Sequence, residues 1–102
     1  KKFAYITSKM GSIDDNKGGG SYVYRSSKAA LNAVVKSIAV DLGNAGFSAA
    51  VLHPGWVLTD MGGPNALIDA STSVSGMLKV IDNLDAGNNG SFFNYDGGII
   101  PW

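Results

Sequence analysis

The chain has 102 residues, 45% of them apolar and 14 of them glycine, a composition typical of one globular domain rather than of a disordered or fibrous protein. Eight basic and eight acidic side chains are scattered along it and leave a net charge of zero, so we expect no nucleic-acid partner and no anionic membrane surface. The absence of cysteine excludes a disulfide framework and favours a reducing compartment, for which the cytoplasm is our prediction. Because no apolar run approaches the roughly 20 residues that cross a bilayer, we expect no membrane-spanning segment.

Strand, loop and helix are predicted in that order along the first half of the chain. Residues 3–7, FAYIT, are β-branched, aromatic and apolar without alternation, which predicts a strand covered on both faces, as in parallel sheets. Residues 8–21 are polar and glycine-rich and predict an irregular loop. Apolar side chains then recur at steps of three and four, which predicts an amphipathic helix over residues 21–42 that Gly43 and Gly46 are suited to end.

The second half is predicted to add a strand, a helix and a strand. Residues 47–53, FSAAVLH, form an apolar run that Pro54 halts, which predicts another buried strand. A second helix is predicted over residues 73–84, where Gly76 is tolerated at about 1 kcal/mol relative to alanine. The last strand is expected at about residues 91–94.

The alternation of these elements predicts an α/β fold. Crossovers of this length join parallel strands, so we expect a β-α-β-α-β unit of three parallel strands with two main helices in a single domain spanning residues 1–102. One edge of the first strand has no partner inside the chain. We therefore expect either a second copy of the chain or neighbouring elements missing from it to cover that edge.

The stretch SYVYRSSKAALN places Tyr24 and Lys28 four residues apart, on one face of the first predicted helix. A phenol beside an ammonium suits proton transfer, because the cation stabilises the phenolate. The alternative is a core tyrosine and a solvated lysine, since a bare Y-x-x-x-K is common by chance. Context favours the functional interpretation, because a strand that ends in serine precedes the pair and a strand that ends in Pro-Gly follows it.

Three segments together resemble one known family. The segments ITSKMGS, YRSSKAALN and HPGWVLTDMGG match, in order and spacing, the strand-end serine, the Tyr-x-x-x-Lys pair and the Pro-Gly loop of the short-chain dehydrogenase/reductase family. Within it the chain is most similar to carbonyl reductases of the C-factor and sniffer type, also on account of its ending FFNYDGGIIPW. The resemblance covers essentially the whole chain and implies a partial Rossmann-like unit.

The resemblance also implies roles for individual residues. Tyr24 is expected to protonate a carbonyl oxygen as hydride arrives, or to act as the base in the reverse direction. Lys28 is expected to stabilise the phenolate and to bond the nicotinamide ribose, and Ser8 to polarise the substrate carbonyl. Ser12 is the alternative to Ser8, because it is nearer to Tyr24 in sequence. The residues expected to contact the cofactor are Tyr24, Lys28, Pro54, Gly55, Val57 and Thr59, and residues 61–75 would shape the substrate pocket.

Other features of the sequence have simpler interpretations. Without the Tyr and Lys pair, the serines would be strand caps and PGWV a strand terminator with a buried Trp56. His53 is the only histidine, and a lone strand-end histidine is more often packed or hydrogen-bonded than catalytic. The segment KGGGS lacks the spacing of phosphate-binding loops and is interpreted as a flexible loop. The dispersed aspartates predict no metal site.

Part of the family pattern is missing. No strand and glycine-rich turn for a dinucleotide comes before Tyr24, the family's catalytic asparagine is absent, and Asn32 lies on another helix. We therefore interpret the chain as the C-terminal catalytic portion of an oxidoreductase that uses NADP or NAD on a small carbonyl or alcohol, inactive without its N-terminal half. The alternative is a non-enzymatic, self-associating remnant domain that retains the catalytic residues.

Overall fold

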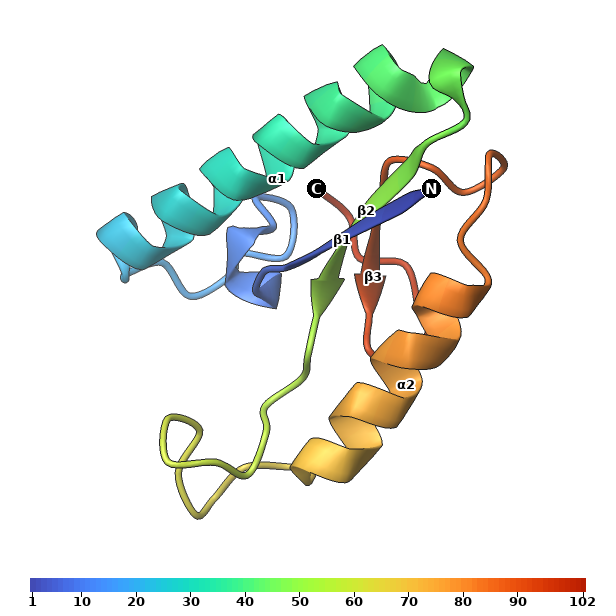
Figure 1. The fold of residues 1–102 in the computed structure, drawn as a ribbon. Helices are drawn as coiled ribbons and strands as arrows, with labels where there is room; N and C mark the ends of the chain where they lie inside the picture. The colour runs from blue at the N-terminus through green and yellow to red at the C-terminus, as the bar shows by residue number, and fades with distance from the viewer.

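The computed structural model describes all 102 residues, and its helices and strands follow the predicted order (Figure 1). The three strands form one parallel sheet in the order β1-β2-β3. The predicted α/β unit of three parallel strands and two main helices is therefore confirmed. The elements are β1 (Lys2–Ile6), the 3-10 helix η1 (Lys9–Gly11), α1 (Tyr22–Leu42), the 3-10 helix η2 (Gly43–Ala45), β2 (Ser48–His53), α2 (Ala70–Asp82) and β3 (Ser91–Asn94).

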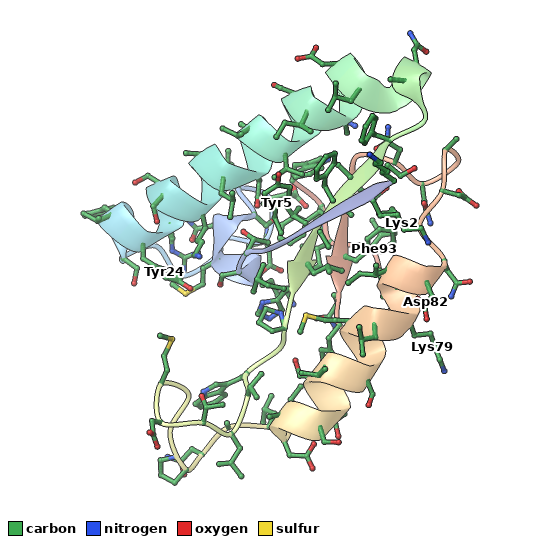
Figure 2. The ribbon with its side chains drawn as sticks, viewed as in Figure 1. Lys2, Tyr5, Tyr24, Lys79, Asp82 and Phe93 are labelled. Carbon is green, nitrogen blue, oxygen red and sulfur yellow. The ribbon has the colours of Figure 1, made fainter.

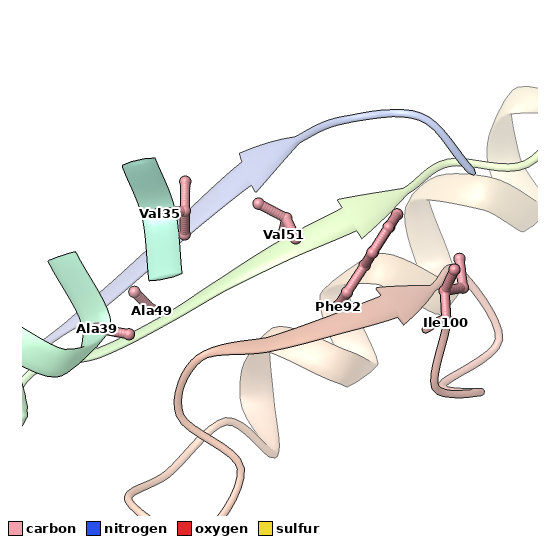
Figure 3. Packing of buried hydrophobic residues seen from close by; sticks show 6 residues of the cluster. All are labelled: Val35, Ala39, Ala49, Val51, Phe92 and Ile100. Atoms are coloured by element: carbon pink, nitrogen blue, oxygen red, sulfur yellow. The ribbon is translucent and has the colours of Figure 1, made fainter. Parts of the chain in front are cut away.

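The two helices lie on opposite faces of the sheet and enclose β2 between them (Figure 1). Each face has its own apolar cluster, and β2 contributes to both, which explains why its sequence is apolar without alternation. The cluster under α1 consists of Val35, Ala39, Ala49, Val51, Phe92 and Ile100 (Figure 3). The cluster under α2 consists of Ala50, Leu52, Leu84 and Phe93.

The first strand departs from the prediction. Phe3 and Tyr5 pack against the cluster under α1, but Ala4 and Ile6 on the other face are exposed, Ile6 by 51%. The physical reason is the position of α2, which packs on β2 and β3 and leaves this face of β1 uncovered. The expectation of a strand covered on both faces is therefore wrong for β1, whose outer edge also has no strand partner.

One long side chain connects β1 with the end of α2. The ammonium of Lys2 donates to the carbonyl oxygens of Ile81 and Asp82, at 2.9 and 3.0 Å (Figure 2). These carbonyls belong to the last turn of α2, where a cation also compensates the negative end of the helix dipole.

The helix ends differ from the predicted ones in ways that follow from capping. Gly46 has φ 84 and takes the left-handed conformation expected of a terminating glycine, whereas Gly43 has φ −57 and continues into η2. The second helix begins at Ala70 rather than at Ser73, because the Asp69 carboxylate accepts a hydrogen bond from the Thr72 N–H at 2.7 Å. Hydrogen bonding from the Thr72 side chain, together with this backbone hydrogen bond, lowers the pKa of Asp69.

The structure supplies a packing reason for Gly76, which the sequence presented only as a tolerated helix residue. A Cβ at this position would lie 2.3 Å from the carbonyl oxygen of Tyr95, in the turn after β3. The glycine therefore lets α2 approach that backbone directly. Neither helix is long and apolar enough to cross a membrane.

Candidate active site

A cavity of about 650 Å³ lies at the carboxyl ends of β1 and β2, the edge of a parallel sheet where ligands commonly bind. It brings together six residues that the sequence marked as site candidates, although these come from three separate parts of the chain. They are Ser8, Tyr24, Pro54, Gly55, Val57 and Thr59. A second cavity of about 540 Å³, beside α2 and the turn after β3, contains none of them.

Tyr24 (Figure 2) and Lys28 lie on the same face of α1, as their spacing predicted. The ammonium of Lys28 is 5.7 Å from the centroid of the Tyr24 ring. Tyr24 is 46% exposed and lines the cavity, whereas Lys28 is half-buried and is not part of the cavity wall. This geometry places a positive charge beside a phenol that lines the cavity.

The two candidate serines have different surroundings. Ser8 lines the cavity, where its hydroxyl oxygen accepts the Met10 N–H at 3.1 Å and caps η1. Ser12 is 2% exposed and lies away from this cavity, because its hydroxyl donates to the carbonyl of Pro101 and accepts the Asp15 N–H at 3.0 Å. Of the two, only Ser8 shares a cavity with Tyr24.

Two contacts hold the end of β1 against α1. The buried hydroxyl of Thr7 donates to the Asn32 side-chain oxygen at 2.7 Å. Next to it, η1 meets α1 so closely that a Cβ on Gly11 would lie 2.9 Å from the Asn32 amide nitrogen and 3.0 Å from the backbone of Lys28. Together these contacts bring Ser8 to the helix that carries Tyr24. The Asn32 amide nitrogen itself has no hydrogen-bond partner.

The loop after β2 is held by α2. The hydroxyl of Ser73, which is 2% exposed, donates to the carbonyl of Pro54 at 2.6 Å. Gly55 follows with φ 84, and a Cβ there would lie 2.8 Å from Ile68 and 2.9 Å from the Tyr95 ring. Ser73 was not among the predicted site residues, although its place one helical turn before Met77, on the buried face of α2, was the available signal.

The segment that follows folds back on itself beside the cavity. Trp56 is 50% exposed, so the alternative of a buried tryptophan is wrong, and its indole N–H donates to the Gly62 carbonyl at 2.7 Å. Val57 forms a bridge with Ile68, and the Thr59 hydroxyl accepts the Gly62 N–H at 3.2 Å. Residues 61 and 62 line the cavity, whereas the later part of the expected pocket-shaping stretch belongs to α2.

His53 also lines the cavity, at the last position of β2. Its Nδ1 accepts the backbone N–H of Lys9 at 3.0 Å, so it is a hydrogen-bonded histidine of the kind the sequence suggested. Burial lowers its pKa, and the Lys9 ammonium lowers it further. No three His, Cys, Asp or Glu side chains gather into a metal-binding group.

Comparison with known proteins identifies the family. The model of the family described as enoyl-(acyl carrier protein) reductase matches residues 4–92. The chain belongs to the short-chain dehydrogenase/reductase family. The predicted family resemblance, including its C-factor and sniffer character, is confirmed by the relatives that follow.

Two family members illustrate how similar this chain is to proteins of known name. It is 53% identical to the C-signal protein of Myxococcus xanthus, over 100% of this chain and 61% of that protein. The carbonyl reductase Sniffer of D. melanogaster is 46% identical and superposes with a TM-score of 0.94, over 99% of this chain and 41% of the Sniffer chain. The chain therefore spans about half the length of the family members that it matches.

The Thr7 to Asn32 hydrogen bond gives a first test of the site's construction. We expect Thr7→Val to lower the free energy of unfolding by about 1 to 3 kcal/mol, because it leaves the buried Asn32 oxygen without a donor. Thr7→Ser keeps the hydroxyl and serves as the matched control, with a smaller loss. Urea unfolding followed by circular dichroism measures both, and equal stabilities of the two variants would contradict the assigned role of this bond.

Proposed function

We propose that this chain is the C-terminal catalytic part of an NAD(P)(H)-dependent short-chain oxidoreductase that interconverts carbonyl and alcohol groups by hydride transfer. The observation that carries the proposal is the single cavity that Ser8, Tyr24 and the Pro54 to Thr59 segment share. Chance would not place a hydroxyl, a phenol with a neighbouring ammonium and a Pro-Gly loop at the same edge of the sheet. Membership of an oxidoreductase family supports the same conclusion.

Tyr24 is the proton donor in this proposal. Its phenol lies at the cavity wall and its ring lies beside the Lys28 ammonium, which stabilises the phenolate that remains after the proton is given to the carbonyl oxygen. In the alcohol-oxidising direction the phenolate takes the hydroxyl proton. Lys28 would also hold the nicotinamide ribose of the bound cofactor.

Ser8 holds the reacting carbonyl. Its hydroxyl oxygen already accepts the Met10 N–H, and the hydroxyl donates no hydrogen bond within the chain. The proton is therefore available to a substrate oxygen in the cavity, where a fixed donor stabilises developing negative charge. These surroundings favour Ser8 over Ser12 as the residue that polarises the substrate carbonyl.

The residues present fit the nicotinamide end of a dinucleotide. Pro54, Gly55, Val57 and Thr59 would hold this end, Val57 through its backbone and Thr59 through its hydroxyl, and the bound cofactor would supply or accept the hydride. Related structures include an NADPH-bound carbonyl reductase from chicken fatty liver, 38% identical, and a Burkholderia multivorans protein with bound NADP, 32% identical. The cofactor proposed here is accordingly NADP or NAD, and the substrate a small carbonyl or alcohol.

A comparison of two tyrosines on α1 tests the proposal. The DNA upstream of Lys1 should encode a strand and a glycine-rich turn in frame. The protein that includes this upstream part, which we call the completed protein, should oxidise NADPH when given carbonyl compounds. Tyr24→Phe should lower kcat by about 10² to 10⁴, because it removes the proton donor. Tyr22 is 85% exposed on the same helix, so Tyr22→Phe is the matched control and should leave kcat unchanged. Equal activity of the two variants would sink the proposal.

The chain of residues 1–102 alone should bind NADPH weakly. It lacks the G-x-G-x-x-G spacing, and the cavity wall holds only one cation, Lys9, so most phosphate and adenine contacts are missing. We expect no saturation below the millimolar range in a titration of NADPH fluorescence. Micromolar affinity would show that this chain contains more of the cofactor site than we propose.

The unpaired edge of β1 supports the alternative function, a self-associating domain without catalysis, and both functions predict association of the isolated chain. The outer edge of β1 has no strand partner and Ile6 beside it is exposed, so pairing with a second copy satisfies backbone groups and buries apolar surface. Sedimentation should therefore detect oligomers at high concentration. A monomer at every concentration speaks against both the pairing and this alternative function.

A further inference from the structure

The side chain of His53 joins two elements at the rim of the cavity. It belongs to the last residue of β2, and its Nδ1 accepts the backbone N–H of Lys9 at 3.0 Å, across 44 residues of sequence. Because Nδ1 is the acceptor, the proton of the neutral ring lies on Nε2. This hydrogen bond therefore exists only with the neutral imidazole in one tautomer.

Lys9 is the residue directly after Ser8, so the bond acts on the turn that carries this serine. Within the turn, the Ser8 hydroxyl accepts the Met10 N–H, and the Ser8 carbonyl accepts the Gly11 N–H at 2.9 Å. On its α1 side the turn rests on Lys28 and Asn32 through Gly11. On its β2 side, the hydrogen bond with His53 connects it to the end of β2, directly before Pro54.

We propose that His53 is a positioning residue, whose neutral imidazole holds the Ser8 turn against the end of β2 and so sets where the Ser8 hydroxyl stands in the cavity. The catalytic meaning of this role rests on the proposed function of Ser8. His53 acts through the backbone of Lys9 and takes no proton from the substrate.

Protonation of the ring removes this bond, because the imidazolium carries a proton on both nitrogens and has no acceptor for the Lys9 N–H. Burial lowers the pKa of His53, the Lys9 ammonium lowers it further, and the Asp15 carboxylate opposes them. Lys9 and Asp15 form an exposed ion pair at 3.8 Å. The other titratable groups at this end of the sheet are Tyr24 in the cavity wall and Tyr95 and Asp96 in the turn after β3.

The direction of the pH effect follows from this lowered value. In the unfolded chain the imidazole titrates near 6.5, whereas in the folded chain it takes up its proton at a lower pH. Between these two values the unfolded chain holds the extra proton. The stability that His53 contributes is therefore complete above about pH 6.5 and declines as the pH falls toward the folded value.

Two amide variants separate the bond from the bulk of the side chain. Asparagine can place its side-chain oxygen where Nδ1 is, whereas the oxygen of glutamine corresponds to Nε2. His53→Asn should therefore keep an acceptor for the Lys9 N–H without titrating, and His53→Gln should lose it at every pH.

Nuclear magnetic resonance of the 102-residue chain between pH 8 and pH 5 tests this without any activity measurement. In the wild type, the Lys9 and Met10 amide signals should move with the His53 ring, at a midpoint below 6.5, and the ring should carry its proton on Nε2 at pH 8. His53→Asn should keep the high-pH amide positions throughout, and His53→Gln should show the low-pH positions throughout. If His53→Gln does not fold, the wild type and His53→Asn decide alone. If the Lys9 amide signal of the wild type does not change as the His53 ring takes up its proton, the inference is overturned.

The pH dependence of kcat in the completed protein gives a second test. The kcat of the wild type should fall on the acid side with the midpoint of the ring, and His53→Asn should lose this acid limb. If Tyr24→Phe inactivates the completed protein but His53→Asn leaves the pH profile of kcat unchanged, the inference is contradicted and the proposed function stands. If the Lys9 amide signal follows the protonation of His53 but the completed protein has no reductase activity, the proposed function is contradicted. The contact between His53 and the turn then still stands.

Discussion

The close approach of the turn after β1 to the backbone of α1 is the constraint on which the site depends. At Gly11 no side chain fits, since a Cβ would lie 2.9 Å from the Asn32 amide and 3.0 Å from Lys28. This contact places Ser8 beside the helix that carries Tyr24, and the Thr7 to Asn32 hydrogen bond fixes the same alignment from the strand. Because the turn is short, a small displacement at Gly11 would move Ser8 away from Tyr24.

The other half of the cavity is held from the opposite face of the sheet. Ser73 on α2 donates to the Pro54 carbonyl, and Gly55 allows Ile68 and the Tyr95 ring to approach the loop. The helices on the two faces therefore each support one wall, and His53 connects the walls through Lys9. A parallel sheet makes this possible because the carboxyl ends of β1 and β2 meet at the same edge.

One face and one edge of β1 are not covered by any other part of this chain. Only 18 of its 102 residues are buried, and β1 is covered on the face of Phe3 and Tyr5 but open on the face of Ile6. The chain covers 61% of the C-signal protein and 41% of the Sniffer chain, and the outer edge of β1 has no strand partner within it. The sequence of β1, apolar on both faces, already indicated such cover, although the chain does not provide it.

Local patterns in the sequence determined the three strands, the two main helices, their order and the pairing of Tyr24 with Lys28, because periodicity and an i to i+4 spacing need only nearby residues. They missed the Asp69 cap, which moved the start of α2 to Ala70. Only the tertiary structure decided which serine faces the cavity, that Ser73 holds Pro54 and that His53 holds Lys9. The physical reason is that these hydrogen bonds join residues 19 and 44 positions apart, and no local spacing encodes which distant backbone group a buried side chain will meet.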